Sequence, residues 1–179
     1  MKKSEKTPES DVGVLFCRAQ PWHIGHQAII DEIEADGLIP MVIFGGSNKY
    51  DDRHPYHWER KKMLDLSGNT SALYAFLDDN EDWDIWLKDV EAVLPDNPII
   101  YINNKPQDRI CFTIKGKTYE DAFYNDMWHD LGYTTKHVTF PELRGLEGIN
   151  ATSIRNDLEK MRWALHSNVY KYIKELNAI

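Results

Sequence analysis

The chain has 179 residues, a formal net charge of −8, 42% apolar residues and 28% charged residues. These values are typical of a soluble globular protein and exclude a disordered chain, a collagen and a coiled coil. No run of apolar residues is long enough to predict a membrane span. The acidic balance also argues against general nucleic-acid binding, because that affinity depends largely on contacts between basic side chains and phosphates.

The first eleven residues carry charges without the apolar run of a secretory signal, so we expect a disordered leader over residues 1–11. No Ser-, Gly- or Pro-rich linker divides the rest, which predicts a single domain over residues 12–179. Cys17 and Cys111 are far apart and lie among apolar neighbours. We expect both to be buried free thiols in a reducing compartment, the cytoplasm.

Strand and helix patterns then alternate along the chain. In chain order we expect a strand at 12–17, a helix at 25–36, a strand at 39–44, a helix at 56–66, a strand at 72–77, a helix at 83–94, strands at 98–102 and 136–140, and helical structure over 152–179 with a break near Ser167 and Asn168. Within residues 103–118, the Lys-Gly-Lys at 115–117 indicates a hairpin or a flap. The alternation predicts an α/β fold with a Rossmann-like open parallel sheet and helices on both faces.

The end of the first strand carries the first group of polar residues. Arg18 is followed by His23 and His26, three positions apart at the turn into a helix, with Gly25 between them. Helix N-termini bind anions, and a nearby phosphate would favour the charged imidazole. The segment therefore predicts a phosphate site. A metal site and a simple surface pair of histidines are the alternatives.

A second helix start lies at residues 148–155, where Thr152 or Ser153 is a suitable N-cap and Arg155 follows in the first turn. We expect this helix to continue through Leu158 and Met161. Alone, the segment suggests an ordinary cap with a surface arginine. Together with the first motif, it predicts a second clamp for phosphates.

These segments resemble the signatures of the nucleotidyltransferase superfamily, and most closely those of the short, single-domain nicotinamide-mononucleotide (NMN) adenylyltransferases. Residues 17–26, CRAQPWHIGH, match the family's GRxQPxHxGH segment except for the leading glycine. Residues 46–47 and 54–60 resemble its G-S loop and NPFxxxER motif, and residues 151–155 resemble its S/T-x-x-R helix start. The resemblance covers about residues 12–173 and implies a fold of the nucleotidyltransferase type with a helical C-terminus.

The resemblance implies adenylyl transfer, in which NMN and ATP, with Mg²⁺, give NAD and pyrophosphate. His23 and His26 would hold the ATP phosphates around the α-phosphorus, while Arg18 and Arg155 would hold the β- and γ-phosphates. The remaining residues that the family pattern implies in binding are Gln20, Gly25, Ser47, Arg60, Asp79, Trp86, Thr152 and Ser153. No resident metal ligand is implied, and members of the family often form homo-oligomers.

Two roles in this set have explicit alternatives. Asp79 lies seven positions before Trp86, and the resemblance places the indole on the nicotinamide and the carboxylate on its carboxamide. Trp86 is otherwise a core residue, because apolar residues surround it in the sequence. Arg60 either meets a phosphate or lies on a helix surface beside acidic residues.

Other functions compete with this interpretation. The nearest is a sister transferase that acts on pantetheine phosphate, on FMN, or on glycerol phosphate with CTP. A class I aminoacyl-tRNA synthetase also carries an HIGH motif, but this chain is short, acidic and lacks a KMSKS loop. A non-catalytic module that senses nucleotides is the remaining alternative.

Overall fold

The computed structural model of the protein describes residues 10–104, 108–138 and 149–178. Almost all of the expected leader, and the last two residues of the strand expected at 136–140, lie outside these ranges.

Five strands form one parallel sheet in the order β3-β2-β1-β4-β7. Their bounds are Val12–Cys17 (β1), Ile39–Phe44 (β2), Leu73–Phe76 (β3), Ile99–Ile102 (β4) and Thr134–His137 (β7). The predicted open parallel sheet is confirmed.

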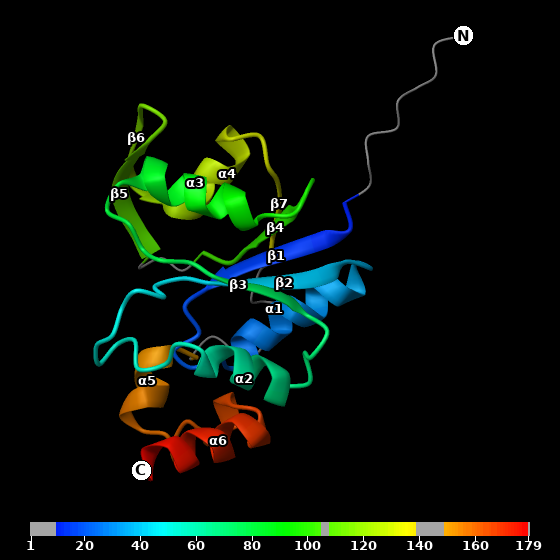
Figure 1. Ribbon diagram of the computed structural model, residues 1–179, viewed down its shortest axis with the longest axis vertical. Coiled ribbons are helices and arrows are strands. Elements are labelled where there is room, and N and C mark those ends of the chain that lie inside the picture. Colours follow the sequence, from blue (N-terminus) through cyan, green and yellow to red (C-terminus); the bar gives the residue numbers. More distant parts are fainter. Residues whose placement is uncertain (1–9, 105–107, 139–148, 179) are drawn as a thin grey trace.

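Helices cover both faces of this sheet (Figure 1). The α-helices are Ile24–Ala35 (α1), Glu59–Leu66 (α2), Trp83–Val93 (α3), Met127–Asp130 (α4), Ala151–Asn156 (α5) and Ser167–Asn177 (α6), and the 3₁₀ turns are Tyr124–Asp126 (η2) and Arg162–Ala164 (η4). Helices α3 and α4 lie on one face, and α1, α2, α5 and α6 lie on the other. Within the described residues, no helix is both long and apolar enough to cross a membrane.

Alternate residues of the central strands point into two separate cores, because side chains of a strand alternate between its faces. Leu15 and Val42 pack with α1, α2 and α6, whereas Val14 and Ile43 pack with α3 and α4. Because both faces are covered, these strands are apolar throughout rather than alternating. Short, apolar, β-branched runs in the sequence therefore predicted the positions of these strands.

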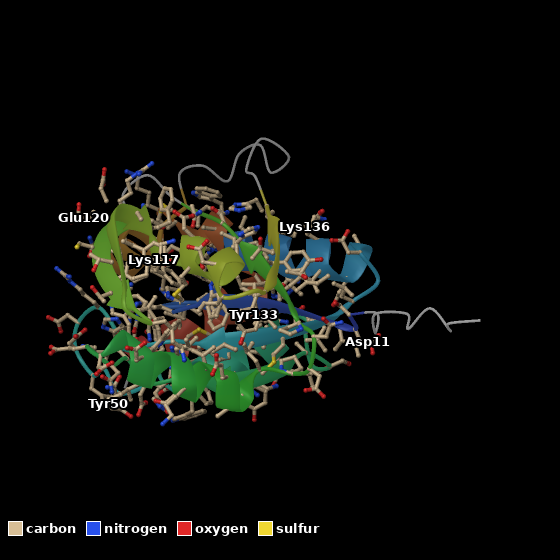
Figure 2. The ribbon with its side chains drawn as sticks, turned by 90° about the horizontal axis from the view of Figure 1, so that it is seen from above. Asp11, Tyr50, Lys117, Glu120, Tyr133 and Lys136 are labelled. Atoms are coloured by element: carbon tan, nitrogen blue, oxygen red, sulfur yellow. The ribbon has the colours of Figure 1, made fainter. Side chains whose placement is uncertain are left out.

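The expected hairpin is present and is longer than predicted. Strands β5 (Arg109–Ile114) and β6 (Lys117–Phe123) form a separate antiparallel pair. Phe112 packs against Trp83 at a ring distance of 4.7 Å, and the amide of Lys115 donates to Asp84 of α3 at 2.7 Å. Seen from above, the hairpin lies at the opposite end of the molecule from Asp11, which precedes β1 (Figure 2). The hairpin is therefore fixed to α3 at the carboxyl end of β1.

The expectation for the cysteines was wrong for Cys111. Cys17 is partly buried, but Cys111 is exposed. The reason is the alternation of β5, in which Phe112 and Ile114 point inward and Cys111 points to solvent.

The C-terminal region is less helical than expected. Helix α5 ends at Asn156, with a backbone hydrogen bond from the C-cap Asp157 to Ser153, so it does not continue through Leu158 and Met161. Turns and η4 separate it from α6, so the expected break near residue 167 begins about ten residues earlier.

Candidate active site

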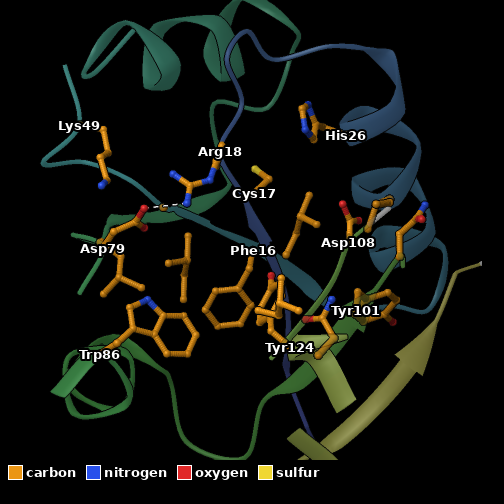
Figure 3. A pocket seen from close by; sticks show the side chains of 18 of the residues that line it. Phe16, Cys17, Arg18, His26, Lys49, Asp79, Trp86, Tyr101, Asp108 and Tyr124 are labelled. Carbon is orange, nitrogen blue, oxygen red and sulfur yellow. Dashed lines mark hydrogen bonds and ion pairs between the residues drawn. The ribbon is translucent and has the colours of Figure 1, made fainter. Parts of the chain in front are cut away.

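The principal cavity lies where the order of the strands reverses. The chain runs from β1 outward to β2 and β3, then returns to the other side of β1 with β4 and β7. Ligands of open α/β sheets bind at the carboxyl ends of the strands at such a point. A cavity of about 800 Å³ is present there (Figure 3). Six of the twelve predicted site residues line it, namely Arg18, His23, Gly25, His26, Asp79 and Trp86.

The two histidines cap helix α1. His23 is the N-cap, and its Nδ1 accepts the amide N–H of Gly25 at 3.1 Å. The Nδ1 of His26 accepts the amide N–H of His23 at 3.2 Å, which completes a capping box. The two rings stack with their centroids 3.7 Å apart. A side chain at Gly25 would lie 2.9 Å from the His23 ring, so the glycine makes room for this arrangement.

These caps determine the tautomer of both imidazoles. An Nδ1 atom that accepts a hydrogen bond cannot carry a proton, so the neutral rings hold theirs on Nε2. The capped geometry fits a neutral ring, and the charged form that we expect beside a bound phosphate stays a prediction. Protonation of either ring at Nδ1 would cost that ring its cap. Both rings can therefore act as neutral Nε2–H donors.

Arg18 extends from the end of β1 toward two other loops. Its Nη2 donates to Asp79 Oδ2 at 2.7 Å, and its Nη1 lies 3.0 Å from His54 Nε2. Asp79 Oδ1 also accepts the amide N–H of Gly46 at 3.1 Å. The structure thus pairs two residues that the sequence assigned to different ligands, Arg18 to phosphates and Asp79 to a carboxamide.

Trp86 belongs to the core and to the cavity wall at once. Only 9% of its surface is exposed, and it packs with Phe16, Tyr124 and Trp128 at ring distances of 6.0 to 6.4 Å. It also lines the cavity, where Figure 3 shows it across from Arg18. The two alternatives for this residue are therefore compatible, because one edge of a core aromatic can face a ligand.

Arg60 has neither of the roles weighed from the sequence. It is fully buried, and its guanidinium donates to the carbonyl oxygens of Arg18 (2.9 Å), Gly45 (2.7 Å) and His57 (2.9 Å), and to Ser47 Oγ (3.0 Å). It therefore braces the loops after β1 and β2 rather than facing a ligand or lying on a helix surface. The reason is that α2 starts at Glu59, so the side chain of Arg60 points toward the sheet.

The side chain of Gln20 forms hydrogen bonds with the backbone of Tyr56. It is buried, its amide nitrogen donates to the Tyr56 carbonyl at 2.6 Å, and its oxygen accepts the Tyr56 amide N–H at 2.9 Å. Neither Gln20 nor Ser47 is among the described residues that line the cavity. Gln20 joins the loop after β1 to the loop before α2, and Ser47 Oγ accepts from Arg60, which also binds the Arg18 carbonyl.

The second helix start lies on the other side of the same loop. Arg155 Nη1 donates to the Gln20 carbonyl at 2.6 Å, and its Nη2 donates to Thr152 Oγ1 at 3.3 Å. Arg155 lines a neighbouring hollow of about 270 Å³ together with Asp51 and Tyr56. Of the described residues, those that line the large cavity do not include Arg155, Thr152 or Ser153.

The cap of this helix differs from the expected one. Neither Thr152 nor Ser153 is the N-cap, because Asn150 occupies that position and its side chain accepts the amide N–H of Ser153 at 2.7 Å. Asn, Ser and Thr are all good N-caps, and the chain direction before the helix decides among them.

The cavity also contains residues that the sequence analysis did not select. Lys49 is one cation at its rim, and Tyr124 forms part of its wall. Asn103 lines it too, and its Nδ2 is buried without a hydrogen-bond partner among the described residues. The rule that ligands bind beyond strand ends would have identified Asn103, which directly follows β4. No comparable signal marked Tyr124.

Two ionisable groups in the cavity wall are held in their neutral forms. Burial raises the pKa of the Cys17 thiol to about 12, and the nearby Arg60 guanidinium only partly opposes this. Burial likewise raises the pKa of the Tyr124 phenol. Thiol nucleophiles require a lowered pKa, so Cys17 is a wall residue rather than a nucleophile.

Some solved structures are similar to this fold. No family model matches the sequence, and no curated protein matches it. A bifunctional NMN adenylyltransferase/ADP ribose pyrophosphatase from Francisella tularensis is similar in structure, with a TM-score of 0.68 at 18% identity over 96% of this chain and 51% of that chain. The same protein complexed with AMP and a manganese ion gives a TM-score of 0.63 at 16% identity, over 96% of this chain and 50% of that one.

A NadR protein in complex with NAD and AMP-PNP is similar over 88% of this chain and 45% of that chain, with a TM-score of 0.55 and 15% identity. The chain thus spans about half the length of the solved structures that it matches. Two of these neighbours are structures of a bifunctional NMN adenylyltransferase, and this chain shares the Rossmann-like α/β fold of its structural neighbours.

Proposed function

We propose that this protein transfers an adenylyl group from ATP to NMN, giving NAD and pyrophosphate. The observation that carries the proposal is the composition of one cavity at the strand-order reversal. It holds two imidazole donors at a helix N-terminus, an arginine, and an indole beside a carboxylate. Donors for a polyphosphate and a flat apolar surface for a cationic ring therefore lie in the same space.

The reaction needs charge stabilisation more than proton transfer. An oxygen of the NMN phosphate, already anionic, attacks the α-phosphorus of ATP while the bond from that phosphorus to the bridging oxygen of the β-phosphate breaks. No general base is required. The Nε2–H groups of His23 and His26 would donate to the α-phosphate oxygens. Such preorganised donors act on the charge that develops in the transition state.

The acceptor would occupy the side of the cavity formed by Asp79 and Trp86. An indole face attracts a cationic ring such as nicotinamide, and a carboxylate oxygen can accept from an amide N–H. In the structure Asp79 is paired with Arg18. We propose that Arg18 turns toward the β- and γ-phosphates when ATP binds, which frees one Asp79 oxygen for the acceptor.

The second helix start would meet the far end of the triphosphate. The Arg155 guanidinium contacts the carbonyl of Gln20, three residues before His23. Thr152 and Ser153 lie in the same short helix and would add donors. We propose that the triphosphate extends from the large cavity toward the neighbouring hollow, which Arg155 lines.

The magnesium ion would arrive with ATP. Across residues 10–104, 108–138 and 149–178, no group of three or more His, Cys, Asp or Glu side chains is arranged to hold a metal ion. We propose that the ion is held mainly by substrate phosphates, as Mg²⁺ commonly is. When bound, it would neutralise charge on the leaving pyrophosphate.

The test is synthesis of NAD by the purified full chain with Mg·ATP and NMN, measured by reduction of the product with alcohol dehydrogenase. Nicotinic acid mononucleotide, pantetheine phosphate, FMN, and glycerol phosphate with CTP serve as matched acceptors, with release of pyrophosphate as the common readout. Preference for NMN supports the proposal. Preference for another acceptor would reassign the protein to a sister transferase, and ATP binding without any product would indicate a nucleotide sensor.

A further inference from the structure

Two loops surround the guanidinium of Arg18, one between β2 and α2 and one after β3. Gly46, in the loop after β2, has a positive φ of 64°, and a side chain there would lie 2.3 Å from Arg18 Nη1. Asp79, after β3, accepts from Nη2 at 2.7 Å. His54, before α2, presents Nε2 at 3.0 Å from Nη1. The cation is thus positioned from several sides, although half of its side chain is exposed.

His54 must be the acceptor in its contact with Arg18. A guanidinium has only donors, so the 3.0 Å contact requires an unprotonated Nε2 on His54. The other ring nitrogen, Nδ1, lies 2.8 Å from Asp51 Oδ1. A carboxylate only accepts, so Nδ1 carries the proton. Asp51 is held in turn by the amide N–H of Arg53 at 2.9 Å.

This tautomer is opposite to that of the catalytic pair. His23 and His26 both accept at Nδ1, whereas His54 donates there. The hydrogen bond from His54 also lowers the pKa of the Asp51 carboxyl, which therefore stays ionised. Two hydrogen bonds thus run in series: the Arg18 guanidinium donates to the neutral imidazole of His54, and that imidazole donates to the Asp51 carboxylate.

We propose that His54, oriented by Asp51, is a positioning residue that sets the Arg18 guanidinium for the polyphosphate and makes this placement dependent on pH. The kinetic part of this inference rests on the proposed function. Charged groups from several elements surround His54. Its own loop contributes Asp51 and Arg53. Arg18 contacts it directly, Asp79 lies beyond Arg18, and Arg155 lies across the hollow from Asp51.

Protonation of His54 would break the arrangement. The proton would go to Nε2, so two donors and two positive charges would face each other across the contact with Arg18. The guanidinium would then be held by Asp79 alone. Turnover should therefore fall as the pH drops, while the affinity for ATP does not improve.

The kinetic test compares His54→Gln and His54→Leu with the wild type between pH 5.5 and 8.5. A glutamine places an amide oxygen near the position of Nε2 but does not titrate, so we expect kcat close to wild type at pH 8 and a ratio of kcat to that of the wild type that rises toward the acidic end of the range. Leucine removes the acceptor, and one charge-assisted hydrogen bond corresponds to about a tenfold loss of kcat at every pH.

His57→Gln is the matched control, because this histidine lies in the same loop but its ring stacks on Phe76 at 5.1 Å. It should keep the wild-type pH profile. A constant ratio of kcat between His54→Gln and wild type across the pH range would overturn the proposal. So would an ATP KM that falls at low pH in the wild type only, since that result means His54 binds phosphate directly.

A second measurement does not depend on activity. Nitrogen chemical shifts of a protein labelled with ¹⁵N-histidine distinguish the two neutral tautomers, and His54→Gln assigns the resonance. At pH 8 we expect the Nδ1–H form for His54 and the Nε2–H form for His23 and His26. An Nε2–H tautomer at His54 would overturn the proposal even in an active enzyme. The expected tautomer in a protein that makes no NAD would instead refute the proposed function alone.

Discussion

Replacement of Arg60 by methionine tests whether this side chain stabilises the loops or binds phosphate. In the structure its buried guanidinium donates to the carbonyls of Arg18 and Gly45, which belong to the loops after β1 and β2. A buried polar group that loses its partner costs ~1–3 kcal/mol, so two carbonyls correspond to roughly 2–6 kcal/mol of unfolding free energy. In a chain of this size each kcal/mol lowers Tm by about 2–4 °C, so we expect a decrease of roughly 4–24 °C.

The assay is thermal and urea unfolding followed by circular dichroism, with steady-state kinetics below the transition. Lys62→Met is the control, because it removes an exposed cation from the same helix. That change should cost less than about 1 kcal/mol. A Tm of Arg60→Met that matches the control, combined with a raised KM for ATP, would refute the brace and support the phosphate contact.

Three further outcomes follow from the site. His26→Ala should lower kcat for NAD synthesis by ~10²–10³ while the circular dichroism spectrum stays folded, because it removes a donor to the reacting phosphate; wild-type turnover would contradict that role. Trp86→Phe should raise the KM for NMN more than that for ATP, because it weakens stacking with a cationic ring; equal changes would make Trp86 a core residue only. Iodoacetamide at pH 8 should label the exposed Cys111 and spare Cys17, whose pKa of about 12 leaves almost no thiolate, as mass spectrometry of the tryptic peptides will show; labelling of both cysteines would contradict this.

Much of the architecture follows from local patterns. The strands at residues 12–17 and 39–44 have the predicted bounds, because apolar, β-branched runs flanked by loops have few alternatives to a buried strand. The histidine pair and Arg18 were located by their place at a strand end before a helix, and they line the cavity. These features depend on neighbours in the sequence, so the order of residues is sufficient to predict them.

Long-range contacts account for what the sequence did not predict. Arg60 and Gln20 have the residue types of ligands, but their donors and acceptors are used by loops from other parts of the chain. Cys111 lies in an apolar run, yet its position in a two-stranded hairpin turns it to solvent. The tautomers of His23 and His54 depend on which partner each nitrogen meets, a backbone amide in one case and Asp51 in the other.

The amino-acid order was therefore enough to predict the sheet, the helix starts and the loops that carry the chemistry, since periodicity and capping act over a few residues. The division of polar residues between loop bracing and ligand binding depends on which groups the fold brings together. A hydrogen bond formed within the protein occupies a donor that a substrate would otherwise use, and its partner can lie many residues away, as Gly45 and Arg60 do. The residues next to a polar side chain in the sequence do not show whether it will bind another loop or a substrate.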